Sequence, residues 1–419
     1  MKSQVSMVLA GLIVWSASFA PSKSFSSEVV TLKQAIQAGL RNNPRTQANS
    51  LRLQAAFEQV VAARQSAYLP RAEIGMTSKL NGQRETTRYL SVNLNLFNGF
   101  ADYYRIKAQE CNYKRTEAVY NSTNAFIQNT SGQIVGLIVD SYVELIRKRE
   151  SLSFYRKLNE RIEKSLLVAK NEAQTNSLLN LKDTILIYID ELESEIEIQE
   201  TNYEAAVNQP VPERITSFAE TLASIDVPGT AQDSFAISLE KSPDILSARL
   251  NLECLKYAYQ ANQANLYSAR VDLNYYKEKS SAGSSSKNDS VQVRLSVPFD
   301  LGAINSHLAE AKEISAAELD LDGAISDVQK DLKNTYTTLR SSERSILSYE
   351  RSFRNNEEKI ENYMVRLDSL NVTQIDDLIS LLSSSMSNRS NLNYYYMQTI
   401  NLKYSIQRNI GTLFETNFL

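Results

Sequence analysis

The sequence predicts a mainly α-helical protein with a small β part, arranged as a duplicated helix–β-hairpin–helix unit. Residues recur at seven-residue spacing in one ladder per half of the chain, and nearly all of them are apolar. The ladders are Ile138, Leu145, Leu152, Asn159, Leu166 and Ala173, then Leu332, Leu339, Ile346, Phe353, Ile360 and Leu367. This spacing is typical of long coiled-coil helices. Two strand-like segments precede each ladder, and only 12 Gly and 8 Pro interrupt the 419 residues.

The first 26 residues are predicted to be a signal peptide. Lys2 supplies a positive start, and the apolar run Val8–Trp15 follows it. Small residues continue to Ala20, but Pro21 hinders cleavage there, so we place the cleavage site near Ser26. The alternative is an N-terminal membrane anchor, for which this apolar run is short.

The first unit, residues 27–207, opens with helical sequence in which Thr31 is a suitable N-cap. Pro44 interrupts this pattern. Pro70 ends it, because the residue before a proline is pushed out of the helical region. From residue 71 to residue 98 apolar and polar side chains alternate. This alternation predicts a β-hairpin with one apolar and one polar face.

A very long helix is predicted after this hairpin, from about residue 100 to residue 173, followed by a turn and a return helix. At 1.5 Å per residue the long helix would span about 100 Å. Such a length exceeds that of helices in ordinary globular domains. Helices of this kind could form a filament, a rigid spacer or the wall of a tube.

Prolines and a glycine mark a connector at residues 208–230, and the second unit, residues 231–419, repeats the first. It contains a hairpin at 270–300, a long helix at about 303–369, a turn, a return helix and a C-terminal tail. The two hairpins bring four strands to one end of the molecule, and four strands cannot close a barrel alone. Either other copies of the chain complete a barrel, or the strands form a small sheet with one face on a helix.

Composition argues against several classes of function. The 45 basic and 48 acidic residues nearly balance, so there is no electrostatic footprint for nucleic acid. His307 is the only histidine, which rules out a multi-histidine metal site within one chain, and we expect it to be a surface or helix-packing residue. We therefore expect no enzyme, no cofactor and no metal. The two cysteines, Cys111 and Cys254, are compatible with a disulfide or with two free thiols.

Several short motifs follow one another in a characteristic order. They are Thr31-Leu32, Ala35, Leu40, Asn43-Pro44, Leu69-Pro70, Leu96-Phe97-Asn98-Gly99, and Tyr142 with Leu145. Their order and spacing resemble the TolC-like outer-membrane channel family over about residues 31–414. By this resemblance Phe97 and Gly99 form the strand-to-helix corner of the first unit, and Pro298 and Gly302 form that of the second.

The resemblance implies a homotrimer in the outer membrane of a Gram-negative bacterium, with a large periplasmic part. Three sets of four strands would form one twelve-stranded β-barrel, and the helices would continue it as an α-barrel. Residues 208–230 would form a belt around its middle. Tyr89, Tyr275 and Tyr276 could lie in an aromatic girdle at the membrane interface.

The implied function is a passive exit duct for substrates driven by an inner-membrane transporter, with a periplasmic adaptor (membrane fusion) protein as partner. It would serve type I protein secretion or multidrug efflux, and the sequence does not name the cargo, the transporter or the adaptor. The alternative is a periplasmic coiled-coil adaptor or structural spacer without a pore.

The resemblance also suggests a periplasmic gate. Asp376 matches an acidic gate position of the family, and Asp377 and Asp183 are further candidates. The family's ion-pair latch is not carried over, because its positions differ here. Those departures are Leu367, Leu370, Val372 and Ile379. Thr373 and Asp376 also have the spacing of a capping box, as do Asn180 and Asp183, so helix capping is the competing interpretation.

Overall fold

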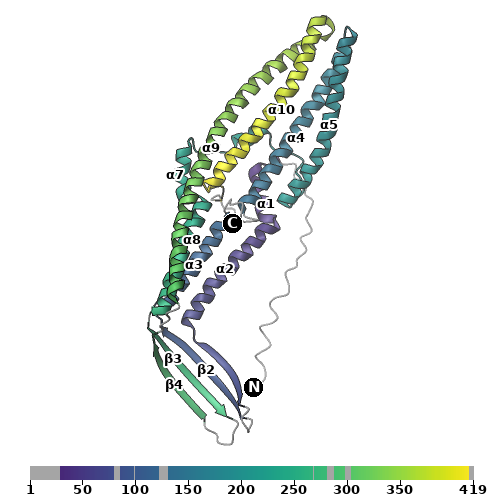
Figure 1. Ribbon diagram of the computed structural model, residues 1–419. Coiled ribbons are helices and arrows are strands. Elements are labelled where there is room, and N and C mark those ends of the chain that lie inside the picture. The colour runs from purple at the N-terminus through teal and green to yellow at the C-terminus, as the bar shows by residue number, and fades with distance from the viewer. Residues whose placement is uncertain are drawn as a thin grey trace.

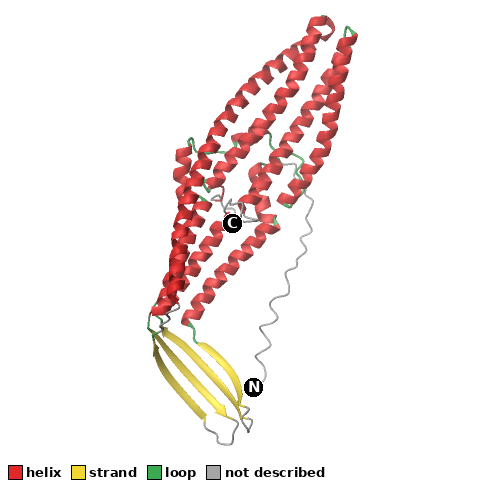
Figure 2. Ribbon diagram, viewed as in Figure 1, coloured by secondary structure: helices red, strands yellow, loops and turns green. Residues whose placement is uncertain are grey.

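The computed structural model describes residues 29–79, 85–98, 100–121, 131–267, 269–280, 287–297 and 303–414. In these residues a four-stranded antiparallel sheet lies at one end of an elongated molecule, and long helices extend from it (Figures 1 and 2). The predicted fold class, mainly helical with a small β part, is confirmed for the chain. Within the described ranges no helix has both the length and the apolarity of a membrane span. The predicted signal peptide and its cleavage site lie outside the described residues.

In the first half the described residues form two helices, a pair of strands and three further helices. They are α1 (Leu32–Asn42), α2 (Pro44–Tyr68), β1 (Arg71–Lys79), β2 (Glu85–Phe97), α3 (Ala101–Asn121), α4 (Ser131–Leu166) and α5 (Glu172–Val207). The Thr31 side chain accepts a hydrogen bond from the Gln34 amide, and the Asn43 side chain accepts one from the Arg45 amide, so both helix starts are capped. Pro44 takes the first position of α2, where no amide hydrogen is needed.

The second half repeats this order after a connector that contains the short helix α6 (Phe218–Ala223). Its elements are α7 (Ala231–Lys241), α8 (Pro243–Tyr267), β3 (Arg270–Ser280), β4 (Lys287–Ser296), α9 (Ala303–Val365), η1 (Leu367–Ser369), α10 (Val372–Asn409) and η2 (Thr412–Phe414). Helix α9 alone has 63 residues, which corresponds to about 95 Å.

The lateral order of the strands is also the order of the helices that adjoin them. The sheet runs β1-β2-β3-β4, and contacts between helices join α2 to α3, α3 to α8 and α8 to α9. The pairing of β2 with β3 joins the two halves into one sheet. Each strand therefore adjoins one helix, and strands and helices are arranged side by side in the same order (Figure 1).

In the half of the molecule far from the sheet, the lateral order is α9, α10, α4 and α5 (Figure 1). The described chain thus has two lateral edges along its length. Strand β4 and helix α9 form one edge, and β1, α2 and α5 form the other. Helix α9 is the one element that follows an edge through both halves.

Most of the second ladder is buried as predicted, with Leu332, Leu339, Ile346 and Ile360 at the packed face of α9. The first ladder is wrong near its end. Helix α4 ends at Leu166 rather than near residue 173, and Ala173 belongs to α5. The buried residues there are Leu158 and Ile162. The helix ends early because Asn171 starts a new one: its side chain accepts a hydrogen bond from the Gln174 amide at 2.8 Å.

An apolar core around the middle of the molecule holds the connector against the helices. Tyr142 of α4 is fully buried there. Its hydroxyl donates to the Val30 carbonyl at 2.7 Å and accepts from the Thr216 amide at 3.2 Å. Burial raises the pKa of this hydroxyl, since the charged form would lose its hydration. Tyr142 therefore links the start of the described chain to the connector.

Candidate functional site

One face of the sheet is largely apolar, and on it Lys277 and Asp289, which form a salt bridge, share a row with Ile74 and Leu90. The register places Ala72, Val92, Tyr275 and Val291 in one row across the four strands. Further members of this face are Ile74, Met76, Leu90, Leu94, Leu273, Val293 and Leu295. Several are largely exposed; the exposed fraction is 84% for Ile74 and 69% for Val293. An exposed apolar surface of this extent needs a partner or a membrane to cover it.

The opposite face of the sheet is polar. Arg71, Asn93, Asn274 and Gln292 form one row across it, and the Asn93 side-chain amide donates to Asn274. On the same face, Glu73 accepts a hydrogen bond at 2.9 Å from the hydroxyl of Tyr89. The sheet therefore has one largely apolar face and one polar face.

The three tyrosines near the hairpins do not share one face. Tyr275 lies in the row of Ala72, Val92 and Val291 on the largely apolar face. Tyr89 and Tyr276 lie on the polar face, where their rings stack with centroids 5.9 Å apart. The suggestion of a girdle is therefore wrong for these two, because the strand register turns them away from the apolar side.

The outer edges of the sheet, β1 and β4, pair with no other strand in the described chain. Each presents unpaired backbone amides and carbonyls, which act as a template for pairing with another strand. An elongated sheet with two such edges and one apolar face is incomplete as a single chain.

The strand-to-helix corner can be followed in the first half. Phe97 ends β2 just after a register shift against β3, and its ring packs edge-on against Phe100 at 5.6 Å. The Asn98 side chain accepts from the Asp102 amide at 3.3 Å, which caps α3. Asp102 also accepts from the Asn95 side chain at 2.9 Å. The other predicted corner residues, Gly99, Pro298 and Gly302, lie outside the described residues.

The two helix–helix turns meet at the end of the molecule far from the sheet. Gln174 at the start of α5 is only 2% exposed. Its side-chain amide donates to a carboxylate oxygen of Asp376 at 3.0 Å and to the Val372 carbonyl at 2.8 Å. Arg161 of α4 adds a salt bridge to Glu357 of α9 at 2.7 Å. These contacts hold the α4–α5 turn against the α9–α10 turn.

The three predicted gate residues have different surroundings. Asp376 and Asp377 are both exposed, and Asp377 accepts a hydrogen bond from the Tyr363 hydroxyl at 2.7 Å. Asp183 is exposed on α5 and forms no salt bridge or hydrogen bond with the described residues. The structure thus brings Asp376 to the junction of the two turns and leaves Asp183 on the lateral edge. Gln174 was missed, since an isolated glutamine belongs to no motif.

The capping interpretation of Asp376 is wrong. Helix α10 begins at Val372 and is capped by Asn371, whose side chain accepts from the Gln374 amide at 2.9 Å in a capping box. Asp376 lies beyond the first turn. The same correction holds for Asn180 and Asp183, which lie inside α5 rather than at its start.

The departures from the family pattern at this turn have a structural reason. Leu370 is buried among apolar side chains of all four helices, and Leu367 and Ile379 pack against the same cluster. Leu370 has an extended backbone with φ −66°, so the position does not need a glycine. Apolar packing therefore accounts for Leu367, Leu370 and Ile379, whereas Val372 is exposed at the start of α10 and this packing does not explain it.

The interface between the two helical pairs is more polar than the core of each pair. Along α4 and α10, Glu150 accepts from Arg389 at 2.6 Å and Ser151 accepts from Asn393 at 2.9 Å. Further along the same interface, Asp140 accepts a hydrogen bond from the side-chain amide of Asn401. Burial raises the pKa of the Asp140 carboxyl, while nearby Arg408 acts in the opposite direction.

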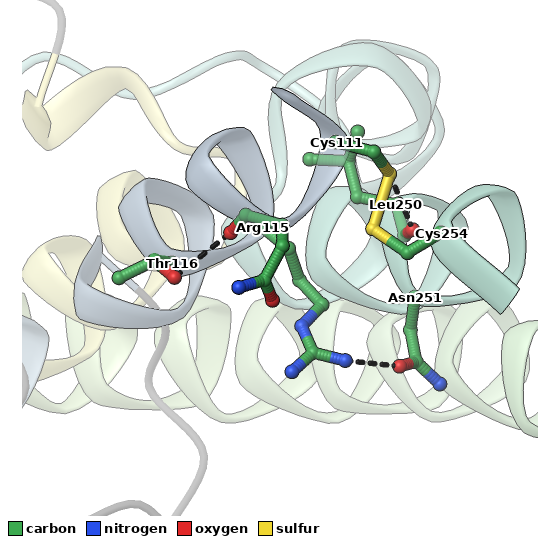
Figure 3. The surroundings of a disulfide bond; sticks show 7 residues. Cys111, Arg115, Thr116, Leu250, Asn251 and Cys254 are labelled. Carbon is green, nitrogen blue, oxygen red and sulfur yellow. Dashed lines mark hydrogen bonds between the residues drawn. A yellow bond between two sulfur atoms is a disulfide. The ribbon is translucent and has the colours of Figure 1, made fainter. Parts of the chain in front are cut away.

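A disulfide joins the two halves near the sheet, which answers the question that the two cysteines left open. Cys111 of α3 and Cys254 of α8 are bonded, with Cα atoms 5.4 Å apart (Figure 3). One turn away, the Arg115 guanidinium donates to the Asn251 side chain at 2.6 Å. The bond fixes α3 against α8, the two helices that adjoin the paired strands β2 and β3.

Comparisons with known proteins agree with this architecture. No protein-family model matches the sequence, and no curated protein matches it. Solved structures do match. The open-state MtrE outer membrane channel of Neisseria gonorrhoeae has a TM-score of 0.71 at 14% identity, covering 91% of this chain and 88% of MtrE. The chain has the fold of the TolC-like outer-membrane channels.

Two further solved structures support this fold. The outer membrane protein VceC of Vibrio cholerae has a TM-score of 0.68 at 14% identity, with 91% of this chain and 96% of VceC covered. CusC, which forms a transmembrane channel, has a TM-score of 0.69 at 16% identity, with 91% of this chain and 92% of CusC covered. The likeness spans 91% of this chain and most of each matched chain.

Proposed function

We propose that three copies of this chain form an outer-membrane channel-tunnel, a passive exit duct across the periplasm and the outer membrane. The observation that carries this proposal is the two-faced sheet with open edges. Its apolar face suits lipid and its polar face suits water, as in transmembrane barrels. A single chain offers both surfaces but encloses nothing between them.

Closure by identical copies follows from the lateral order of the elements. Pairing of β4 with β1 of the next copy would satisfy both sheet edges at once, because such head-to-tail contacts close into a ring when the rotation fits. The helices share the lateral order of the strands. The same rotation therefore closes the helices into a tube that continues the barrel.

We also propose that the duct exports substrates delivered by an inner-membrane transporter through a periplasmic adaptor protein, in type I secretion or multidrug efflux. The support for this is the resemblance to the channel family and the solved channels of the same fold.

Fractionation and conductance test this function together. We expect the protein in outer membranes, where it needs detergent for extraction, and as a trimer that forms ion-conducting pores in planar bilayers. A soluble periplasmic monomer without conductance would reject the duct and favour the alternative of an adaptor or spacer without a pore.

At the gate we propose that Asp376, with Asp377 as a further candidate, lines the narrow end of the tunnel, whereas Asp183 lies on the lateral edge and is not proposed as a gate residue. Three copies of Asp376 around the axis would select cations and hold the turns through Gln174. Asp376→Ala should enlarge single-channel conductance and weaken cation selectivity. Asp376→Asn keeps an acceptor for Gln174 but removes the charge, so it should change selectivity more than conductance. If both variants conduct like the parent channel, Asp376 is no gate residue.

A further inference from the structure

Helix α9 has an unpartnered face along one lateral edge of the molecule. Thr337, Arg340, Ser341, Arg344, Ser345 and Ser348 line an open groove of about 500 Å³ on this face. Neither arginine forms a salt bridge with another described residue. Arg351 is also exposed on this face, about one helical turn beyond Ser348 toward the tip. The small hydroxyl side chains leave room for larger residues of a neighbouring helix. This face of α9 therefore combines exposed arginines with a groove lined by small hydroxyl side chains.

Helix α5 has an unpartnered face of complementary character on the opposite edge. Asp183, Ile187, Asp190 and Ile198 follow one another at helical spacing and are all exposed. The exposed fraction is 57% for Ile187 and 58% for Ile198. This face carries two carboxylates and two bulky apolar side chains, whereas the α9 face carries arginines and small residues.

The complementary groups also lie at matching heights. Gln174 holds the start of α5 beside the start of α10, so α5 and the end of α9 begin from the same level at the tip. At 1.5 Å per residue, Arg351 and Arg344 lie about 21 and 32 Å from the end of α9. Asp183 and Asp190 lie about 17 and 27 Å from the start of α5.

A rotation about the axis of a tube does not change height along that axis. Groups that match in height within one chain therefore match between neighbouring copies as well. Helices α9 and α5 are the two lateral edges of the far half of the molecule (Figure 1). In a closed ring they face each other across every boundary between copies.

We propose that α9 of one copy docks against α5 of a second copy, with Arg344 and Arg351 opposite Asp190 and Asp183. Ile187 then lies over the groove near Ser348, as a knob fills a hole between packed helices. This inference rests on the proposed trimer and assigns the residues that select a second copy as the neighbour. Like charges placed across such a boundary are strongly unfavourable, so the pairing also fixes the register.

Charge reversal on each helix tests the pairing. The double variants R344E/R351E and D183K/D190K should each raise the concentration needed for half-maximal trimer formation by about tenfold or more, because each places like charges in contact. The quadruple variant restores opposite charges and should assemble within about threefold of the wild type. Trimers are counted by native mass spectrometry in mild detergent. Unchanged assembly in both double variants, or no recovery in the quadruple variant, would overturn the pairing.

Cysteine cross-linking tests the register without altering charge. Ser348→Cys combined with Ile187→Cys should give covalent dimers and trimers on oxidation. Ser348→Cys combined with Thr201→Cys should not, since Thr201 lies on the same face about 18 Å further from the tip. Equal cross-linking by both pairs contradicts the inference. A wild-type chain that forms no trimer rejects the proposed channel itself, whereas a trimer that is indifferent to all these variants rejects only this interface.

Discussion

Val293→Arg is expected to prevent stable insertion into the outer membrane. Val293 lies in the middle of β4 on the apolar face, opposite Leu273. An arginine at the midplane of a barrel's lipid-facing side costs about 2–4 kcal/mol, and a trimer carries three of them. We expect a several-fold loss of protein in the outer-membrane fraction, measured by quantitative immunoblotting.

The neighbouring residue provides the matched control. Gln292 precedes Val293 and lies on the polar face in the row of Asn274 and Asn93. Gln292→Arg places the same side chain in water and should leave the amount of membrane protein nearly unchanged. If both variants insert equally well, the assignment of the two faces is wrong.

Loss of the disulfide between Cys111 and Cys254 is expected to be the largest stability effect of a single substitution away from the sheet. The bond closes a loop across a sequence separation of 143 residues. Long loops give the greatest entropic stabilisation, about 4–5 kcal/mol in the chain-entropy model. Cys254→Ser should therefore lower the urea midpoint of unfolding, monitored by circular dichroism.

Reduction of the disulfide separates the effect of losing the bond from the effect of replacing the cysteine side chain. Dithiothreitol should lower the wild-type midpoint to that of Cys254→Ser and leave the variant unchanged. Arg115→Ala, which removes a polar contact between the same two helices, should have a much smaller effect. A wild-type midpoint that is insensitive to reductant would show that the bond does not stabilise the fold.

The features that were predictable from sequence are those with a local period. Burial of Leu332, Leu339 and Ile346 follows from their seven-residue spacing. Residues at this spacing lie on the same face of a helix, whatever the rest of the chain does. The two faces of the sheet follow from alternation in the same way. Thr31 and Pro44 are recognisable because caps and first-turn prolines act within a few residues.

Features that depend on distant contacts were not predictable. Nothing local pairs β2 with β3 or brings Cys111 to Cys254. The tip was misread for a different reason. Asn371 and Thr373 are both good N-caps, and only the packing of Leu370 places the helix start at the former. Gln174 gains its role solely by burial between two turns from different halves.

In the proposed channel, three chains close into a tube through the β1–β4 and α5–α9 edges. A three-dimensional electron-microscopy map of the purified particle in a lipid nanodisc measures this most directly. We expect threefold symmetry, one continuous barrel in the lipid disc, and a hollow helical tube extending from it with Asp376 of each chain near the axis. A particle with one chain, or with sheets that do not join across copies, would contradict it.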